Sequence, residues 1–361
     1  MKTSRRLPGL AALTFAGVAG LLASIAPAAA WDRGNVDTFA VLPADAPKIE
    51  GLTVGDDGNV YVSTFDPTGA SPGTTSFLFV FDGNNGHQIR KVAIAGSSKA
   101  TLGLAFHPTT HKLLVIDFGA ATVLDVDPNS GTSSVFMTVP PAPPPPAPGH
   151  GLNALTFDDS GNVYVSDSFQ GVIWRTGATG GLATAWKTAD PTLQTTGVPG
   201  FGANGLGFNK ARSALFVANT GNDTLVQIAV TNSGGNLIAG AATVLTNSIN
   251  GADGIVLDQD DNIWVVANQA DEIVVVNPTG KAIAKLGDFN GLTKDGVTRG
   301  LLFPASPAFS KDGKSLFVSN LELDLRSLPG GPQTVDSQWA AQVKQHSIAK
   351  LQARIPNFRG D

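Results

Sequence analysis

The sequence has 361 residues, a formal net charge of −5 and no cysteine. Its length allows one large β domain or two ordinary domains, and the lack of cysteine excludes disulfide bonds as a source of stability. The excess of acidic side chains argues against binding to nucleic acid or to anionic lipid. The 42 glycines, 23 prolines and 15% charged residues favour short strands joined by many turns over long helices.

Residues 1–30 have the pattern of a secretory signal peptide. A basic start that ends at Arg6 precedes an apolar run, and three alanines (28–30) follow it, as at a small-residue cleavage site. We therefore expect export to the periplasm or the medium. Removal of this segment takes away three cations and changes the formal charge from −5 to −8. No later stretch is apolar enough to span a bilayer, so no membrane insertion is expected after cleavage.

A motif of about 50 residues recurs six times from residue 50 onwards. Each copy reads as a strand, a tight turn and a second strand. The copies align on Val62, Val115, Val165, Val217, Val265 and Val318. This spacing is typical of propeller blades, and further apolar runs that end in glycine-bearing turns supply a third and a fourth strand in most copies. The sequence therefore predicts an all-β fold, a six-bladed β-propeller with four-stranded blades, in a single domain over residues 31–361.

Two segments lie outside this repeat. Residues 35–42 read as an orphan strand before the first copy, while the sixth copy has no clear last strand. We expect the N-terminal strand to complete the sixth blade and close the ring, which removes an open sheet edge. The tract PPAPPPPAPG (140–149) predicts a stiff polyproline loop on the face where the inner strands begin.

The first residue of the innermost strand of each blade should reach a common ring at one mouth of the central channel. The six occupants are Glu50, Leu102, Asn153, Asn204, Asp253 and Ala305. Four of them carry oxygen donors, which suit a hard divalent cation such as Ca²⁺ better than zinc. The competing interpretation is structural, because Asn-Gly and Asp-Gly are common turn dipeptides. Turn chemistry does not explain Glu50, however.

The stretch GFGANG around Asn204 also satisfies the G-x-G-x-x-G pattern of dinucleotide-binding sites. That pattern requires a helix directly after it, whereas here the chain continues into strand-forming residues. A nucleotide site is therefore excluded at this position, and the turn and ligand interpretations of Asn204 stay open.

Further polar residues are expected at the same mouth. The second strands of successive blades end with Asp117, Asp167, Asn219, Asn268 and Asn320. Such side chains either cap a turn or contact a ligand. His150 lies three residues before Asn153, next to the proline tract. It is either a proton shuttle or substrate contact, or a plain loop histidine.

Four short motifs carry a resemblance to a known family. They are IEGLTV with Glu50, LNALTF with Asn153, ANGLGF with Asn204 and ADGIVLD with Asp253. In this order they resemble the regucalcin/gluconolactonase family of six-bladed propellers (SMP-30/gluconolactonase-like) and, more distantly, the paraoxonases, over nearly the whole mature chain. The resemblance implies that Glu50, Asn204 and Asp253 hold a divalent metal. It also implies that Asn153 contacts the substrate or extends the metal shell.

The chemistry implied by this resemblance is lactone hydrolysis. A Ca²⁺ ion would bind the lactone carbonyl oxygen and stabilise the oxyanion, and Asp253 would act as the general base towards water. Two departures from the family pattern stand out. Gly151 and Leu152 occupy positions where many members have a basic residue, so a sugar lactone loses an anchor, and no counterpart of the paraoxonase histidine pair is evident. We expect a monomer that acts on a small lactone-like substrate.

Two alternatives remain open at this point. The first is a non-catalytic propeller of the NHL type that binds a partner or a small ligand, because strands such as GNVYVSD and NIWVVAN fit those repeats nearly as well. The second is a condensation of the strictosidine-synthase type on the same architecture, for which no residue argues. Binding of Ca²⁺ separates the hydrolase from the NHL alternative.

Overall fold

The computed structural model describes residues 32–66, 73–145, 147–328 and 331–355, all within the unit Asp32–Asp361. The predicted signal peptide lies outside the described residues. Strands predominate in the described part, and the prediction of an all-β fold is confirmed. No helix of the described part is long and apolar enough to cross a membrane.

Three sheets have four antiparallel strands each, in the order of the chain. The first consists of β2 (Lys48–Val54), β3 (Val60–Phe65), β4 (Phe77–Phe81) and β5 (Gln88–Ala93). The second consists of β14 (Ala203–Phe208), β15 (Ala214–Asn219), β16 (Thr224–Ser233) and β17 (Asn236–Thr246). The third consists of β18 (Ala252–Leu257), β19 (Ile263–Ala267), β20 (Glu272–Val276) and β21 (Ala282–Leu286).

A further sheet has eight strands and departs from the expected separate four-stranded units. Its strands are β6 (Thr101–Phe106), β7 (Leu113–Asp117), β8 (Thr122–Val126), β9 (Ser133–Thr138), β10 (Leu152–Phe157), β11 (Val163–Asp167), β12 (Val172–Gly177) and β13 (Gly180–Lys187). The outer strands β9 and β13 join the two halves by a short parallel pairing. Gly180 permits this contact, because a Cβ there would lie 2.1 Å from the carbonyl oxygen of Phe136.

The last four-stranded sheet combines the two ends of the described chain. Its order is β1 (Val36–Val41), β26 (Ser347–Gln352), β25 (Ser315–Asn320) and β24 (Pro304–Phe309). β1 pairs antiparallel with β26, with Val36 opposite Leu351 and Val41 opposite Ser347. The small elements are the hairpin of β22 (Phe289–Leu292) and β23 (Thr298–Gly300), a 3₁₀ turn at Leu325–Ser327 and the helix α1 (Val335–Ala340).

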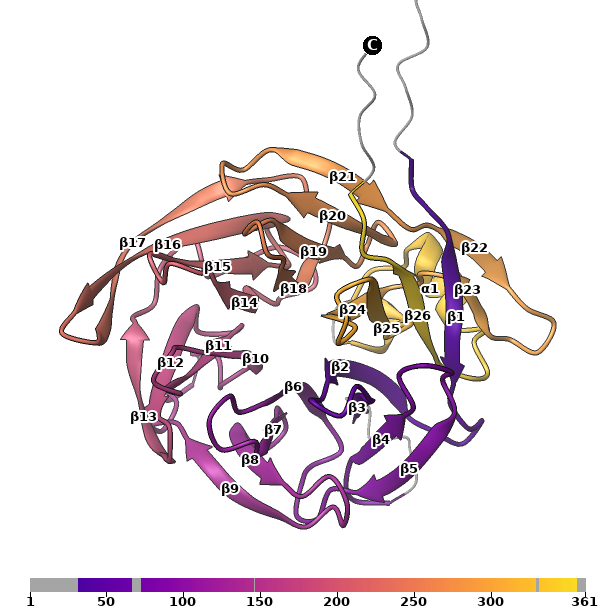
Figure 1. The fold of residues 1–361 in the computed structure, drawn as a ribbon, viewed down its shortest axis with the longest axis horizontal. Coiled ribbons are helices and arrows are strands. Elements are labelled where there is room, and N and C mark those ends of the chain that lie inside the picture. Colours follow the sequence, from indigo (N-terminus) through magenta and orange to yellow (C-terminus); the bar gives the residue numbers. More distant parts are fainter. Residues whose placement is uncertain (1–31, 67–72, 146, 329–330, 356–361) are drawn as a thin grey trace, which may run out of the picture. The chain divides into compact units, whose positions relative to one another are not determined.

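The sheets surround a central opening, as Figure 1 shows, and β2, β6, β10, β14, β18 and β24 lie nearest to it. Neighbouring members of this set of innermost strands contact one another around the opening. The second strands, such as β3 and β15, are buried over their whole length, since each sheet packs against a neighbour on both faces. Large buried side chains such as Phe79, Phe216 and Trp264 fill the space between sheets, where each contributes about 1.5–3 kcal/mol by burial.

Candidate metal centre and active site

Each innermost strand carries a β-bulge, in which two of its residues face one residue of the next strand. In β18 the register shifts between Ala252 and Ile255, so that Asp253 and Gly254 form the bulge. The same shift occurs in β2, β6, β10, β14 and β24. A bulge re-aims a side chain relative to the regular alternation of a strand. In all six strands its first residue is the predicted ring residue.

Glycine follows the ring residue in four of the six bulges, at Gly51, Gly103, Gly205 and Gly254. The backbone of the next innermost strand explains this choice. A Cβ on Gly254 would lie 2.4 Å from the carbonyl oxygen of Ala305, and one on Gly205 would lie 2.5 Å from that of Asp253. These contacts are far below van der Waals distance, so the missing side chains allow the strands to approach closely around the channel.

Gly254→Ala is expected to lower the free energy of unfolding by about 1–3 kcal/mol, because the added methyl group pushes β18 and β24 apart. Urea denaturation measures the change. Gly177→Ala at the end of β12 is the matched control, since nothing lies within 4 Å of its added Cβ, and it should change stability by no more than about 0.5 kcal/mol. Equal stability of the two variants would contradict this account of the glycines.

The structure brings the four oxygen-bearing ring residues to one small cavity of about 40 Å³. The polar residues that line it are Glu50, Asn153, Asn204, Thr220, Asp253 and Asn268. All of them are buried, with at most 5% of their surface exposed. A cavity of this size accommodates an ion or a water molecule, and an organic substrate would require its walls to move.

Two hydroxyl groups orient the carboxamides of Asn153 and Asn204. The Thr220 hydroxyl donates to the Ala252 carbonyl oxygen at 2.7 Å, so it accepts the Asn204 N–H at 2.9 Å. The Ser168 hydroxyl likewise donates to a backbone carbonyl oxygen at 2.6 Å and accepts the Asn153 N–H at 3.3 Å. Because each hydroxyl has a single proton, these bonds set which end of each amide is nitrogen. Both carbonyl oxygens remain available as ligands.

The two carboxyl groups of the ring are held in an environment that disfavours their charge. Burial raises the pKa of Asp253 to about 7, against hydrogen bonds from Asn268 and Asn204 that lower it. Burial, and then the charge of Asp253, raise the pKa of Glu50 well above its ordinary value. Glu50 and Asp253 are the only charged side chains among the described residues that line the cavity. The described lining thus holds two carboxyl groups and no cationic side chain.

Unsatisfied oxygen atoms show that this site fits a hard cation. The Glu50 Oε2 and Asn268 Oδ1 atoms are buried and have no hydrogen-bond partner, although Asn268 donates to the Asp253 Oδ2 atom at 2.9 Å. Buried acceptors without partners are rare and require an explanation. Within the described residues, no group of three or more His, Cys, Asp or Glu side chains is placed to hold a metal ion. A cation here would therefore be held by two carboxylates together with carboxamide oxygens, a set typical of Ca²⁺.

His150 and most of the polar strand ends have other partners. The ring nitrogens of His150 lie 2.8 Å from the Asp167 Oδ2 atom and 2.8 Å from the carbonyl oxygen of Pro140. Asp167 also accepts the Trp174 indole N–H at 3.1 Å. His150 is not among the described residues that line the cavity; it ties the start of the proline tract to the end of β11.

One member of the strand-end series lines the cavity, and the register explains why. Asn268 lies three residues after Val265, whereas Asn219 lies two residues after Val217. Asn268 is therefore equivalent to Thr220 and not to Asn219, whose amide binds backbone carbonyl groups instead. A difference of one residue in a strand reverses the face. Counting from the aligned valines would have identified both Thr220 and Asn268.

The walls of the cavity are otherwise apolar. They consist of Phe65, Leu102, Pro199, Phe201, Phe303, Leu321 and Leu323. Leu102 and Phe303 lie on or next to innermost strands, while Pro199 and Phe201 come from the connection between β13 and β14. No local sequence signal marks residues of such connections as part of a site.

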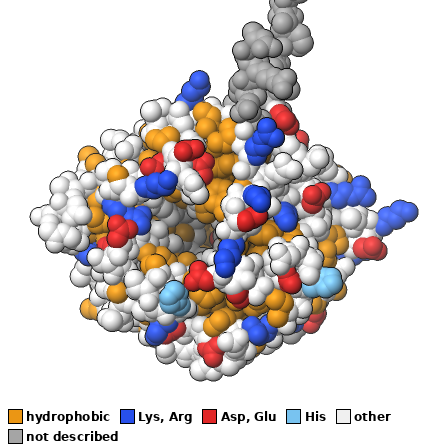
Figure 2. Space-filling model, in the orientation of Figure 1, with side chains coloured by type: hydrophobic (Ala, Val, Ile, Leu, Met, Phe, Trp, Pro, Cys, Tyr) orange, Lys and Arg blue, Asp and Glu red, His pale blue; other side chains and the backbone are white. Residues whose placement is uncertain are grey.

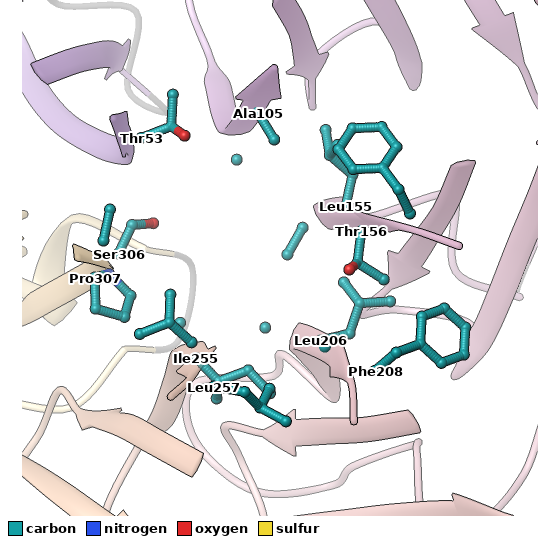
Figure 3. Close-up of a pocket in the computed structure, with 18 of the residues that line it drawn as sticks. Thr53, Ala105, Leu155, Thr156, Leu206, Phe208, Ile255, Leu257, Ser306 and Pro307 are labelled. Carbon is teal, nitrogen blue, oxygen red and sulfur yellow. The ribbon is translucent and has the colours of Figure 1, made fainter. Parts of the chain in front are cut away.

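A wider section of the channel, of about 730 Å³, lies beyond the bulges. Its lining includes Leu155, Leu206, Ile255 and Pro307, each two residues after a ring residue, and Figure 3 shows them around the opening. No described residue lines both this section and the ring cavity. Figure 2 shows a central hollow with hydrophobic side chains in and around it.

Comparison with known proteins supports a family assignment. The model of the SMP-30/Gluconolactonase/LRE-like region family matches residues 97–287, more than half of the chain. Lactonase drp35 from Staphylococcus aureus (strain MW2) is 25% identical over 179 residues, which cover 48% of this chain and 52% of that lactonase. The chain thus spans about half the length of this curated relative.

Solved structures share the fold at low sequence identity. Regucalcin from Agrobacterium tumefaciens, a calcium-binding protein, has a TM-score of 0.59 and 16% identity, with 87% of this chain and 93% of that chain covered. A gluconolactonase from Xanthomonas campestris has a TM-score of 0.55 and 13% identity, with 91% and 99% covered. At these identities the similarity concerns the fold alone. Because the family model matches more than half of the sequence, the chain belongs to the SMP-30/gluconolactonase/LRE-like family.

Proposed function

We propose that this protein is an exported, divalent-metal-dependent hydrolase of lactone-type esters. The observation that carries the proposal is the small buried cavity on which Glu50, Asn153, Asn204 and Asp253 converge, where the Glu50 Oε2 and Asn268 Oδ1 atoms have no hydrogen-bond partner. Membership of a family that includes gluconolactonases, and the similarity to lactonase drp35, support the same reaction class. The basic and apolar start of the chain supports export to the periplasm or the medium.

We further infer that the sheets form the six-bladed propeller expected from the repeat. The eight-stranded sheet then represents two blades joined at their outer strands, and β1 completes the last blade beside β26. The pairing of β1 with β26 supports closure of the ring by the N-terminal strand. Closure matters for the site because the ring residues come from sheets far apart in the sequence, and a loosened ring would separate them.

Glu50, Asn204 and Asp253 would hold the metal ion, for which Ca²⁺ is the best match to the oxygen donors. When bound, such an ion supplies Lewis-acid polarisation of the substrate carbonyl group. Asn268 would contribute in two ways. Its N–H orients the Asp253 carboxylate, and its Oδ1 atom, which has no protein donor, is free to act as a ligand.

Asp253 acts as the general base. Its carboxylate takes one proton from water as the water oxygen forms a bond to the carbonyl carbon. The ring C–O bond then breaks, and the same proton is delivered to the departing alkoxide, so that one lactone and one water give one hydroxy acid. Asn153, whose amide is held by Ser168, contacts the substrate. His150 would assist indirectly, by its bonds to Asp167 and to the proline tract next to the mouth.

Hydrolysis of a lactone panel, followed by pH-stat titration with and without a chelator, tests this function. We expect turnover in Ca²⁺, loss of turnover in EDTA and recovery when Ca²⁺ is added back. Turnover that is indifferent to EDTA would remove the metal from the mechanism. Binding of Ca²⁺ by calorimetry without hydrolysis of any lactone would favour the non-catalytic alternative, a propeller that binds a partner or a small ligand.

A further inference from the structure

The apolar cover of the ring cavity indicates which lactones fit. We propose that the substrate is a lactone with alkyl or aryl substituents and not a polyhydroxylated sugar lactone, and that Phe201 is a specificity-determining residue. This inference rests on the proposed function and adds a substrate class to it. The proposal is based on the residues that line the cavity and on the aromatic side chains next to them.

The cavity offers few hydrogen-bond donors to the oxygen atoms of substrate hydroxyl groups. The carboxamide nitrogens of Asn153, Asn204 and Asn268 each donate one hydrogen bond to a protein acceptor, which leaves at most one N–H of each for a substrate. The Thr220 hydroxyl donates its single proton to a backbone carbonyl group, and the described lining contains no Lys, Arg or His. A buried hydroxyl group without a partner is strongly disfavoured. A sugar lactone carries several hydroxyl oxygens for which the described lining has few donors, while the oxygen acceptors of the ring would hold the metal ion.

Aromatic side chains continue the apolar wall outward from the cavity. Phe201 packs against Phe169 and Phe118, with ring centroids 5.3 Å and 6.1 Å apart, and Phe118 in turn meets Phe65 at 6.1 Å. Phe118, Phe169 and Phe201 come from connections between strands and Phe65 ends β3; Phe65 and Phe201 also line the cavity. A substituent that extends from the ring site would therefore contact aromatic surface. Burial of alkyl or aryl groups against such a surface is favourable.

Phe201 stands at the entrance to this site. It is half-buried, whereas the other apolar residues of the described lining are buried. A cavity of about 40 Å³ is smaller than any lactone, so entry requires a side chain of the cover to turn. Phe201 is the least buried apolar member of the described lining, so its ring is placed to contact a substituent that enters from solvent.

Two six-membered lactones with the same reacting ring separate the alternatives. These are δ-decalactone, which carries an alkyl chain, and D-glucono-1,5-lactone, which carries hydroxyl groups. Each value of kcat/KM is divided by the rate constant of uncatalysed hydrolysis, because the two rings differ in reactivity. We expect the normalised value in Ca²⁺ to be roughly 100-fold higher for δ-decalactone.

Phe201→Ala should lower this selectivity ratio about tenfold, while Phe201→Leu should keep it within about threefold. Phe289→Ala is the matched control, since Phe289 lies on β22 and packs against Trp339 at 5.3 Å, outside the cavity lining. Damage to the fold lowers both activities together and leaves the ratio unchanged. A ratio that moves in Phe201→Ala but not in Phe289→Ala therefore reports substrate contact.

The outcomes distinguish this inference from the proposed function. Preference for the sugar lactone, or an unchanged ratio in Phe201→Ala, overturns the substrate class while hydrolase activity stands. If neither lactone is hydrolysed, the proposed function falls, and calorimetry with the two lactones decides the inference. Selective binding of δ-decalactone that Phe201→Ala weakens would support it, and equal or absent binding would overturn it.

Discussion

Replacement of Asp253 by asparagine is expected to lower kcat for lactone hydrolysis by about 10²–10⁴-fold, the usual contribution of a general base. Asparagine keeps the shape of the side chain but cannot accept the proton of the attacking water. In the metal-free protein, burial raises the pKa of the Asp253 carboxyl group to about 7. Steady-state kinetics in saturating Ca²⁺ measures the loss, and a thermal melt shows whether the variant remains folded.

Asp258→Asn is the control for this experiment, because Asp258 follows the same strand at its other end. Asp258 accepts the Trp264 indole N–H at 3.0 Å and the Asn262 backbone N–H at 2.9 Å, so it supports the turn after β18. We expect this variant to lose some stability and to keep its turnover. Full activity in Asp253→Asn would remove Asp253 from the mechanism.

Glu50→Gln is expected to raise the stability of the metal-free protein at pH 8 by about 1–3 kcal/mol and to abolish stabilisation by Ca²⁺. The metal-free wild type holds two buried carboxyl groups without a cation, and glutamine replaces one of these ionisable groups by a neutral one at nearly constant volume. In the wild type, Ca²⁺ at 100 times its dissociation constant adds about 2.7 kcal/mol. Urea denaturation with EDTA and with Ca²⁺ measures both effects.

The pH dependence of the same pair has a definite sign. Burial raises the pKa of Asp253 from 3.8 to about 7 and that of Glu50 well above 4.5, so the folded protein binds more protons than the unfolded chain between these values. The stability of the metal-free protein is therefore fully present below about pH 4 and declines as the pH rises to about 7. Glu50→Gln should flatten this decline. A stability that rises between pH 4 and pH 7 in EDTA, relative to Glu50→Gln, would contradict the raised pKa values.

Glu272→Gln is the matched control, a buried glutamate in the opposite electrostatic setting. Its carboxylate lies 2.7 Å from the Arg33 guanidinium and 2.7 Å from the Lys285 ammonium group. Removal of this charge leaves two cations without their partner, so we expect Glu272→Gln to destabilise the protein. Opposite signs for Glu50→Gln and Glu272→Gln would identify the missing cation as the cause, whereas equal signs would indicate a general effect of the substitution.

Local patterns in the sequence were sufficient to predict the strands and the residues of the ring. Alternating apolar residues and glycine-bearing turns predicted the all-β fold, because both depend on neighbours in the chain. Glu50, Asn153, Asn204 and Asp253 could be found together because they repeat at one position of one motif. Glycine follows three of these four residues. As Gly254 shows, it allows close packing of neighbouring strands at the bulge.

Tertiary packing decided the rest of the site. Asn268 lines the cavity and Asn219 does not, because one residue of register reverses the direction of a side chain in a strand. Phe201 reaches the cavity from a connecting segment, and its position depends on contacts with Phe118 and Phe169 that are distant in sequence. The sequence by itself thus determined which oxygen donors share a ring, since repetition encodes equivalence. Only the tertiary structure decided which residues cover that ring, because the connections between strands do not repeat in sequence and their positions depend on the surfaces against which they pack.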